Sequence, residues 1–518
     1  MASLWSKFGS QCKSRLSAIA RSCFLGRARW REKFKEASEA LERLHTEMAK
    51  AKADRVRVER ENMELCRRVS ELENQLAQPQ PVTLPLGEPP RGHQYGAGLI
   101  ALCVNLARQI GLRPTRRTLE VVFDWLDVEV EIPRYQTIRL WMQKIGLDRM
   151  NHAKNVPGGV WLTDHTNQIG KEKVLVMLRV PKAKLQRRGT PLRHRDVEVL
   201  AVRPGEAWKR EDVGKVYQET AERYGMPRAI ESDGAVELRD PAEDLGKAGE
   251  KPLVIRDPKH FLANKFESLL KQDADYEAFV KQIAGMRCAL QQTELAHFLP
   301  PGFKMKARFM NLAPTLNWAS AILWHLDHPE SRSRQGIKEC RMTEKLGWLR
   351  DFAPRIQQWQ ECQEVISTAL TFINQQGIFR GAAKQFQALG APLVHHSLSR
   401  QLSQTTLAFL RKYERKLQPN ECLPMSTEIL ESSFALYKQL EKQHSKSGFT
   451  SLLLTYPALL RPTTPKEVTA SLKRVKTVDV NQWIATYLPN TVASKRQLMF
   501  REAKAKPSGG ATPARAAA

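Results

Sequence analysis

Apolar residues recur every three to four positions along residues 31–77, and nearly all the other positions there are polar or charged. In heptad terms they fill positions a and d: Phe34, Ala37, Leu41, Leu44, Met48, Ala51, Val58, Leu65, Val69, Leu72 and Leu76. An isolated helix gains nothing from one narrow apolar stripe, whereas a coiled coil buries it, so the pattern predicts a coiled coil. Asn62 at an a position favours a homodimer. The alternative is a long helix packed on its own chain.

A stretch rich in Pro and Gly at residues 78–92 is interpreted as a linker. Beyond it, residues 93–150 show the pattern of three short amphipathic helices with Gly and Pro at their corners. We expect these helices at 97–111, 115–127 and 133–147. Many three-helix domains share this pattern, and a helix-turn-helix module is one of them.

From residue 157 the apolar period changes to alternating and continuous short runs, which predict strands. The expected order is three strands, a helix, a strand, a further strand and a helix: 158–166, 173–180, 197–203, 211–225, 227–234, 251–257 and 257–271. This order predicts a mixed α/β layer over residues 157–268.

Strand patterns are absent between residues 269 and 422, and the pattern of apolar residues there predicts helices. Its tryptophans are expected in a core, which makes the stretch a folded helical insertion: Trp318, Trp324, Trp348 and Trp359. Residues 423–460 contain one more helix of the α/β core. Residues 461–518 form a C-terminal extension whose low-complexity end predicts disorder.

The charge balance narrows the class of partner. Lys and Arg total 82 against 55 Asp and Glu, a net charge of +27. This excess favours a polyanion, and nucleic acid before a ribosome-adjacent or membrane-surface role. No uncharged apolar run approaches the roughly 20 residues of a membrane span. The eight cysteines lack CxxC spacing, so we expect free thiols, no zinc finger and a cytoplasmic, nucleoid-associated protein.

With DNA as the expected partner, two basic regions gain an interpretation. Residues 1–30 are basic and rich in serine, which suits an arm that touches DNA, although a transit peptide has the same composition. The third helix of the 93–150 region carries polar side chains that suit a DNA-recognition helix: Arg134, Gln136, Arg139, Gln143 and Lys144.

Three carboxylates stand out by position. Asp164 is placed at the end of the first strand, Asp233 at the end of the fourth and Glu431 near the start of the last core helix. Strand ends bring side chains to a common edge. Carboxylates that converge there repel one another unless cations hold them, and hard oxygen ligands select Mg²⁺ or Mn²⁺. Two such ions support in-line displacement at a phosphodiester.

Each residue also has an ordinary structural interpretation. Asp233 precedes a glycine, as turn residues often do, Asp164 can cap a turn, and Glu431 can be a solvated helix residue. Glu428 is a rival third ligand, but a carboxylate in the first turn complements the helix dipole. Glu431 is preferred because Lys438, two turns on, shares its face and can reach a phosphate.

These features together resemble the RNase H-like core of DDE transposases, above all the Mutator and hAT groups and related bacterial insertion-sequence enzymes that carry a helical insertion. The resemblance covers residues 157–460. Asp257-Pro-Lys-His260 matches the family's (Cys or Asp)-x-x-His motif, and Glu431 with Lys438 matches its Glu followed seven residues later by Lys or Arg. The stretch between Asp233 and Asp257 departs from the family, and it holds the decoys Asp240 and Asp244.

The resemblance implies an α/β RNase H-like enzyme that cuts and joins DNA, with Asp164, Asp233 and Glu431 as ligands of two Mg²⁺ or Mn²⁺ ions. His260 is implied as a helper near the site, or else it is a satisfied helix-start histidine. The implied partners are terminal inverted repeats and target DNA. A DNA-binding regulator without catalysis and an RNase H-like nuclease that does not join strands remain the alternatives.

Overall fold

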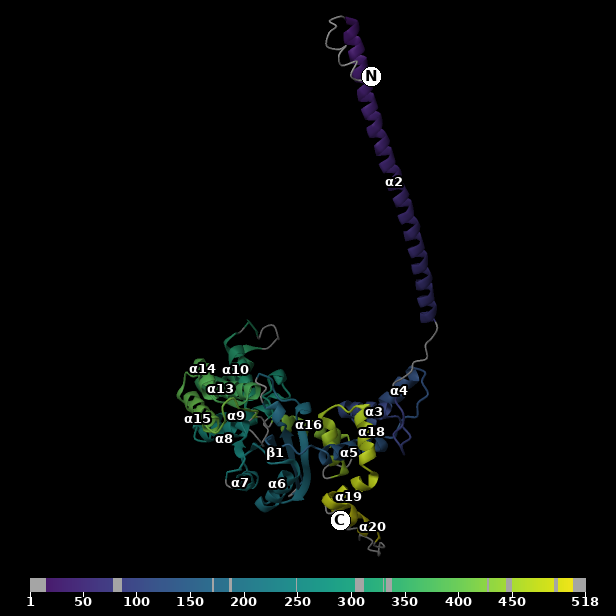
Figure 1. Cartoon of the computed structure of the whole chain (residues 1–518). Coiled ribbons are helices and arrows are strands. Elements are labelled where there is room, and N and C mark those ends of the chain that lie inside the picture. The colour runs from purple at the N-terminus through teal and green to yellow at the C-terminus, as the bar shows by residue number, and fades with distance from the viewer. Residues whose placement is uncertain are drawn as a thin grey trace, which may run out of the picture. The chain divides into compact units, whose positions relative to one another are not determined.

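The chain is described from a computed structural model, which covers residues 15–77, 86–169, 172–185, 189–247, 249–302, 312–328, 330–331, 338–425, 428–443, 450–488 and 492–505. It divides into two compact units, residues 1–84 and 85–518 (Figure 1). Part of the predicted arm (residues 1–14), part of the linker (78–85) and the tail from 506 lie outside the described residues.

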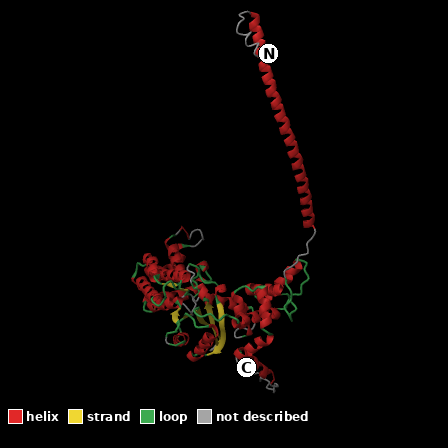
Figure 2. Ribbon diagram, viewed as in Figure 1, coloured by secondary structure: helices red, strands yellow, loops and turns green. Residues whose placement is uncertain are grey.

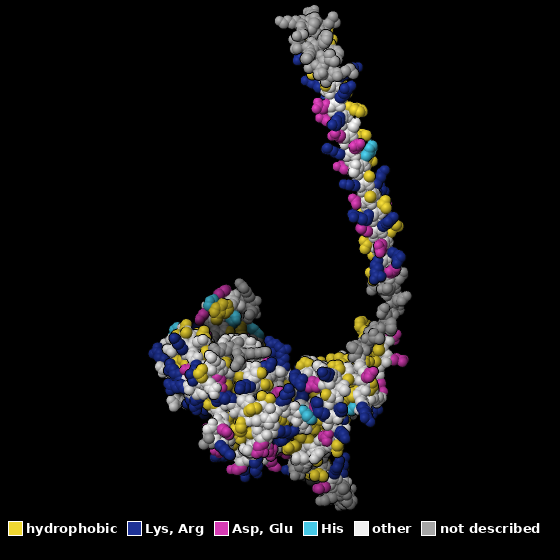
Figure 3. Space-filling view, in the orientation of Figure 1, with side chains coloured by type: hydrophobic (Ala, Val, Ile, Leu, Met, Phe, Trp, Pro, Cys, Tyr) yellow, Lys and Arg dark blue, Asp and Glu magenta, His cyan; other side chains and the backbone are white. Residues whose placement is uncertain are grey.

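The described part of the first unit is the helix α2 (Arg15–Ala77). It begins 16 residues before the heptad pattern that predicted it, so the second half of the predicted arm is helical. Its a and d side chains are exposed, Phe34 at 74% and Leu65 at 62%, and hydrophobic side chains alternate with charged ones along it (Figure 3). Pairs such as Arg55–Glu59 at 2.8 Å stabilise its polar faces. The helix is confirmed, and its pairing with a second copy stays a prediction.

The second unit opens with the three predicted helices, α3 (Ala97–Ile110), α4 (Leu112–Trp125) and α5 (Tyr135–Asn151). The end of the predicted linker belongs to this fold, because the Leu86 carbonyl accepts hydrogen bonds from Gly98 N and Leu99 N. Gly96 is required there, since a Cβ would lie 2.1 Å from the Gly87 oxygen.

A five-stranded mixed sheet follows, in the order β3-β2-β1-β4-β5. Its strands are β1 (Val160–Ile169), β2 (Glu172–Val180), β3 (Glu198–Glu206), β4 (Ala229–Ser232) and β5 (Leu253–Arg256). The first three pair antiparallel, whereas β4 and β5 run parallel to β1. The predicted succession of strands and helices is confirmed (Figure 2).

Helices cover both faces of the sheet. On one face α6 (Arg210–Tyr224) and α7 (Val236–Asp244) bury a core around Trp161, Tyr217 and Ile230. On the other face α16 (Glu428–Lys442) lies against β1 and α5 lies against β3. The decoys Asp240 and Asp244 both pair with Arg210 on α6, so they serve the packing of α7.

The predicted insertion is helical. It comprises α8 (Pro258–Leu270), which leads in from the core, α9 (Ala274–Leu290), α10 (Ala313–Asp327), α12 (Glu339–Leu346), α13 (Ala353–Gln376), α14 (Ala382–Gly390) and α15 (Ser397–Glu414). One short antiparallel pair, β6 (Ile378–Phe379) with β7 (Cys422–Leu423), was not predicted. Trp359 is fully buried as expected, but Trp324 is 51% exposed, stacked on His328.

The C-terminal extension folds onto the first helices. It contains η7 (Ser451–Thr455), α17 (Tyr456–Leu460), α18 (Pro465–Arg474), α19 (Thr477–Tyr487) and α20 (Val492–Ala505). Arg149 of α5 donates hydrogen bonds to the carbonyl oxygens of Pro457 and Arg461 and pairs with Glu467 at 3.0 Å. The predicted separate domains 93–150 and 461–518 are therefore packed together.

Two further properties concern the chain as a whole. Among the residues that the structure describes, no helix combines the length and apolar character of a membrane span. Within the same ranges the cysteines are free thiols, as expected.

Candidate active site

The register of the sheet places two aspartates side by side. β1 and β4 run parallel, and Leu162 is paired with Glu231. Two residues further along each strand come Asp164 and Asp233, which therefore share one face, on neighbouring strands about 4.8 Å apart. Asp164 and Asp233 are 69 positions apart in the sequence (233 − 164), and the parallel pairing of β1 with β4 brings them together.

Asp164 does not end its strand, contrary to the prediction. β1 continues to Ile169 because its antiparallel pairing with β2 persists, with Thr166 opposite Val174. The pairing with β4 stops earlier, at Leu162. Asp164 therefore lies where the sheet narrows beside the end of β4, which leaves an open edge.

Asp233 directly follows β4, as predicted. Its Oδ1 accepts a hydrogen bond from Ala235 N at 2.8 Å, so it is also a turn residue. Gly234 has a φ of +86°, and a Cβ there would lie 2.9 Å from Arg256 Nε. The turn interpretation of Asp233 therefore holds, its role as a metal ligand stays a prediction, and a glycine must follow it.

Glu431 lies in the first turn of α16, the helix that follows the insertion, and its charge acts on Asp164 at the same edge of the sheet. Its Oε2 lies 2.6 Å from Lys259 Nζ, within the Asp257-Pro-Lys-His260 motif. Glu428 is exposed, whereas Glu431 is half-buried. Lys438 is exposed on the same helix, and no ion pair joins it to another described residue.

His260 is oriented by Asp257. The Asp257 carboxylate caps α8 by accepting from His260 N and lies 2.6 Å from His260 Nδ1. This hydrogen bond raises the pKa of His260, and the charges of Asp233 and Asp164 act in the same direction. The histidine is therefore both satisfied at a helix start and directed at the acidic edge.

The electrostatics of Asp164 show that these groups form one cluster. Burial raises the pKa of its carboxyl to about 7, the charges of Asp233 and Glu431 contribute to the rise, and His260 opposes it. We call Asp164, Asp233 and Glu431 the acidic edge. Its members come from β1, from the end of β4 and from α16.

The acidic edge is not arranged as a finished metal site. Within the described residues, no three side chains of His, Cys, Asp or Glu stand close enough together to hold an ion. Glu431 is turned toward Lys259, whose ammonium supplies the positive charge there. The donor chemistry, hard oxygens in mutual repulsion, nevertheless fits a divalent cation.

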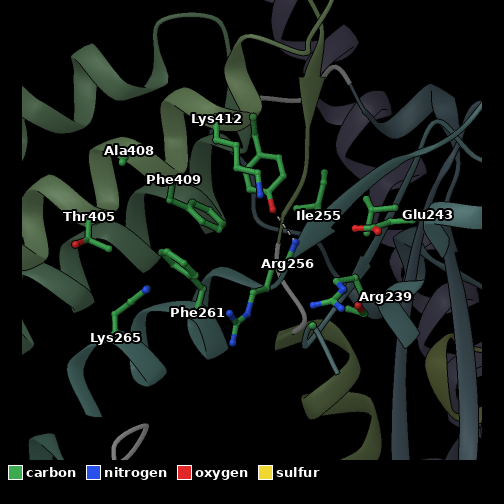
Figure 4. Close-up of a pocket in the computed structure, with 14 residues that line it drawn as sticks. Arg239, Glu243, Ile255, Arg256, Phe261, Lys265, Thr405, Ala408, Phe409 and Lys412 are labelled. Atoms are coloured by element: carbon green, nitrogen blue, oxygen red, sulfur yellow. Dashed lines mark hydrogen bonds between the residues drawn. The ribbon is translucent and has the colours of Figure 1, made fainter. Parts of the chain in front are cut away.

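A cationic cleft of about 490 Å³ lies beside Asp233, between β5 and the insertion (Figure 4). Its described lining includes Arg239, Arg256, Lys265 and Lys412, against the single carboxylate of Glu243. Phe261 and Phe409 stack in it with ring centroids 4.6 Å apart. Cations beside aromatic rings are typical of surfaces that bind nucleic-acid strands.

Arg256 joins this cleft to the acidic edge. Its guanidinium lies 5.6 Å from the Phe261 ring centroid, and its backbone N donates to Tyr413 Oη at 3.1 Å. Arg256 Nε is buried without a hydrogen-bond partner among the described groups. A buried donor of this kind suits a phosphate ligand.

The prediction of a DNA-recognition helix is wrong for the second half of α5. Gln143 and Lys144 are 4% and 6% exposed, because η7, α17 and α18 cover that half of the helix. Gln143 Nε2 donates to the Ser451 carbonyl at 2.8 Å. Arg134 and Gln136 are exposed at the start of α5, and Arg139 is half-buried.

Sequence reasoning missed Lys259 as the partner of Glu431 and missed most of the cleft. The motif that contains Lys259 was recognised for its histidine alone. The cleft combines β5 and α8, which are neighbours in the sequence, with the distant α15. Tyr413 of α15 lies 157 residues from Arg256 of β5. The one sequence signal that could have indicated the cleft is the position of Arg256 directly before Asp257.

The sequence matches no protein-family profile and no curated protein. Among solved structures, the chain is similar to the Drosophila P element transposase strand transfer complex, with a TM-score of 0.36 and 10% sequence identity. That match covers 71% of this chain and 92% of the other. A TM-score of this size carries no argument, so the function must be inferred from the chain's own residues.

Proposed function

We propose that the chain is a DDE-type DNA transposase, a polynucleotidyl transferase with an RNase H-like core whose acidic edge acts on phosphodiesters. The observation that supports the proposal is the placement of Asp164 and Asp233 on neighbouring parallel strands, with Glu431 of α16 near enough for its charge to act on Asp164. A cluster of half-buried carboxylates in a chain of net charge +27 calls for a cationic ligand and a polyanionic substrate.

The three carboxylates are proposed to hold two Mg²⁺ or Mn²⁺ ions, which would activate the attacking oxygen and stabilise the leaving oxygen. The other roles belong to the protein's own cations. Arg256 positions a phosphate through its unpaired Nε, and Lys438 contacts the strand along α16. Lys259 holds Glu431 in place, and His260 orients the DNA or the attacking water.

The test is metal-dependent cleavage and joining of DNA. The substrate is a supercoiled plasmid that carries the DNA flanking the gene, and the products are nicked and joined strands. Asp164→Asn and Asp233→Asn should each lower the rate by at least about a thousandfold, because each removes a metal ligand. Duplex DNA affinity should stay within about twofold of the unchanged protein's.

Asp240→Asn is the matched control, since Asp240 lies seven residues from Asp233 and pairs with Arg210. It should leave cleavage unchanged. If Asp164→Asn and Asp233→Asn still cut, the acidic edge is not the active site. Cleavage without joined products would instead identify an RNase H-like nuclease, and duplex binding without any cleavage a DNA-binding regulator.

We further propose that two chains pair through α2. The supporting observation is its stripe of exposed a and d side chains, which is interrupted at the a positions Arg55 and Asn62 and which Trp30 extends at 75% exposure. Deletion of residues 15–77 should halve the mass measured by sedimentation equilibrium. Leu44→Asp with Leu65→Asp should have the same effect without shortening the chain. An unchanged mass in both variants would exclude this dimer.

A further inference from the structure

A second large cavity, of about 910 Å³, lies between α5, α18 and the segment that precedes α3. The residues that line it include five basic side chains: Arg91, His93, Lys144, Lys473 and Lys476. No Asp or Glu is among its lining residues in the described part of the chain. We call it the cationic cavity.

Lys144 forms the floor of the cationic cavity. Its side chain is on the buried face of α5, at 6% exposure, and no hydrogen bond or ion pair is found for it within the described residues. Burial lowers the pKa of Lys144, and the charge of Asp479 opposes that shift. A nearly buried cation without a described partner is unfavourable, so its position on the cavity lining marks a place for an anion.

Asp479 is not among the lining residues of the cavity, but its charge acts on Lys144 and partly offsets the positive charge there. Its Oδ2 accepts a hydrogen bond from Lys476 N at 2.7 Å, which caps the start of α19. Lys476 and Thr477 themselves line the cavity, so the first turn of α19 adds the partial positive charge of a helix N-terminus. The helix end and the buried ammonium thus favour the same ligand charge.

The cavity recognises charge rather than a base. Its aromatic residues, Tyr95 and Trp141, meet edge to face with centroids 5.3 Å apart, and Trp141 is 3% exposed. Tyr95 Oη is engaged with Glu131 at 3.2 Å. The buried Trp141 ring offers no open face for stacking, which a nucleobase would use, and Tyr95 is held between Trp141 and Glu131.

The basic side chains that line the cavity differ in how far they are exposed. Lys144 is buried, whereas Arg91, Lys473 and Lys476 are exposed at the rim. A small anion needs only an enclosed site, while a polyanion that lies across an opening contacts the rim and the floor together. This arrangement favours a chain of phosphates over a single free phosphate.

We propose that the cationic cavity binds backbone phosphates of duplex DNA and anchors it without reading its sequence. That this DNA is the substrate of the enzyme rests on the proposed function. The binding of phosphates by the cavity does not depend on that function. The anchor lies on α5, α18 and α19, away from the acidic edge. It replaces the base-reading role that the sequence suggested for Lys144.

The experiment measures binding of a random-sequence duplex to the full chain by fluorescence anisotropy across a range of salt concentrations. Lys144→Met should weaken binding roughly tenfold and reduce the salt slope by about 1. Lys473→Gln with Lys476→Gln should reduce that slope by about 2. Both residues are exposed, so this second variant tests the cavity without disturbing the buried part of α5.

Lys384→Met is the matched control, because Lys384 is exposed on α14 and lines neither cavity. It should change affinity by less than twofold. Pyrophosphate should compete with the duplex in the unchanged protein and not in Lys144→Met. Unchanged affinity and slope in both cavity variants would overturn the proposal. Pyrophosphate binding that is lost in Lys144→Met while duplex binding persists would identify a free phosphate compound instead and overturn the DNA assignment.

Failure of the proposed function has a different signature. Asp164→Asn and Asp233→Asn should bind the duplex like the unchanged protein, since neither residue lines the cavity. If the unchanged protein does not cut DNA but Lys144→Met still lowers duplex affinity, the proposed reaction fails and the cavity assignment stands.

Discussion

The acidic edge and the cationic cavity each gather like charges in partly buried places, but they differ in how the fold balances them. At the edge, Lys259 pairs with Glu431 and His260 faces the aspartates. In the cavity, Lys144 pairs with no described carboxylate, and the lining contains none among the described residues, although the charge of Asp479 acts on Lys144. Like charges placed together weaken a fold. The internal counter-ions make the edge suited to exchanging ligands, whereas the cavity is suited to holding one anion.

The strongest prediction for the acidic edge concerns the effect of Glu431, its third residue, on the rate of DNA cleavage. Glu431→Gln should lower the cleavage rate by roughly a hundredfold or more, because it removes a carboxylate beside Asp164. Glu428→Gln changes the neighbouring exposed carboxylate of the same helix and should have little effect. Single-turnover cleavage rates distinguish the two. The reverse result would move the edge to Glu428 and leave Glu431 as the structural partner of Lys259.

A second, smaller effect is the pH dependence of stability without metal. The pKa of Asp164 in the folded chain is about 7, above an unfolded value near 4. The folded chain therefore binds the proton more tightly, so this stabilisation is complete below about pH 4 and is lost as pH rises through 7. Relative to Asp164→Asn, the unchanged protein should lose on the order of 1 to 3 kcal/mol between pH 5 and pH 8.

Thermal unfolding of both proteins in EDTA at the two pH values measures this difference. Mg²⁺ added at pH 8 should restore stability to the unchanged protein and not to Asp164→Asn, because the ligand offsets the repulsion at the edge. Equal pH slopes in the two proteins would show that the carboxylates of the edge do not repel one another.

The smallest effect belongs to the cavity. Lys144→Met should raise the free energy of unfolding by about 1 kcal/mol, because a buried charge without a partner is replaced by an apolar side chain of similar size. Lys473→Met, at the exposed rim, should stay within about 0.5 kcal/mol. Urea denaturation provides both values. A destabilised Lys144→Met would mean that the ammonium has a stabilising partner inside the fold.

The α/β core was predictable because its signals are local. The strand runs, the helix after β3 and the position of Asp233 each follow from a few neighbouring residues. The end of β1 was predicted wrongly, since it depends on pairing with β2 beyond the point where β4 stops. The partner of Glu431 was missed because Lys259 lies 172 residues away.

The burial of α5 was missed for the same reason: the segments that cover it lie about 300 residues further on. One local signal was present. Gly146 lies inside the α5 helix, and a Cβ there would lie 1.9 Å from the Leu454 oxygen. An isolated glycine within a helical pattern is a sign of close packing. Polar residues on α5 were therefore poor evidence of a solvent-facing surface.

The hydrogen bonds of Arg149 have a consequence for synthesis of the chain. Its partner Pro457 lies 308 residues further on. At roughly 5 to 20 residues per second, a ribosome needs about 15 to 60 seconds to deliver that partner. Until then α5 presents an apolar surface and the unpaired guanidinium of Arg149. A truncated product that ends before residue 450 would never complete this region, and only chains that include Thr477 would contain all the described lining of the cationic cavity.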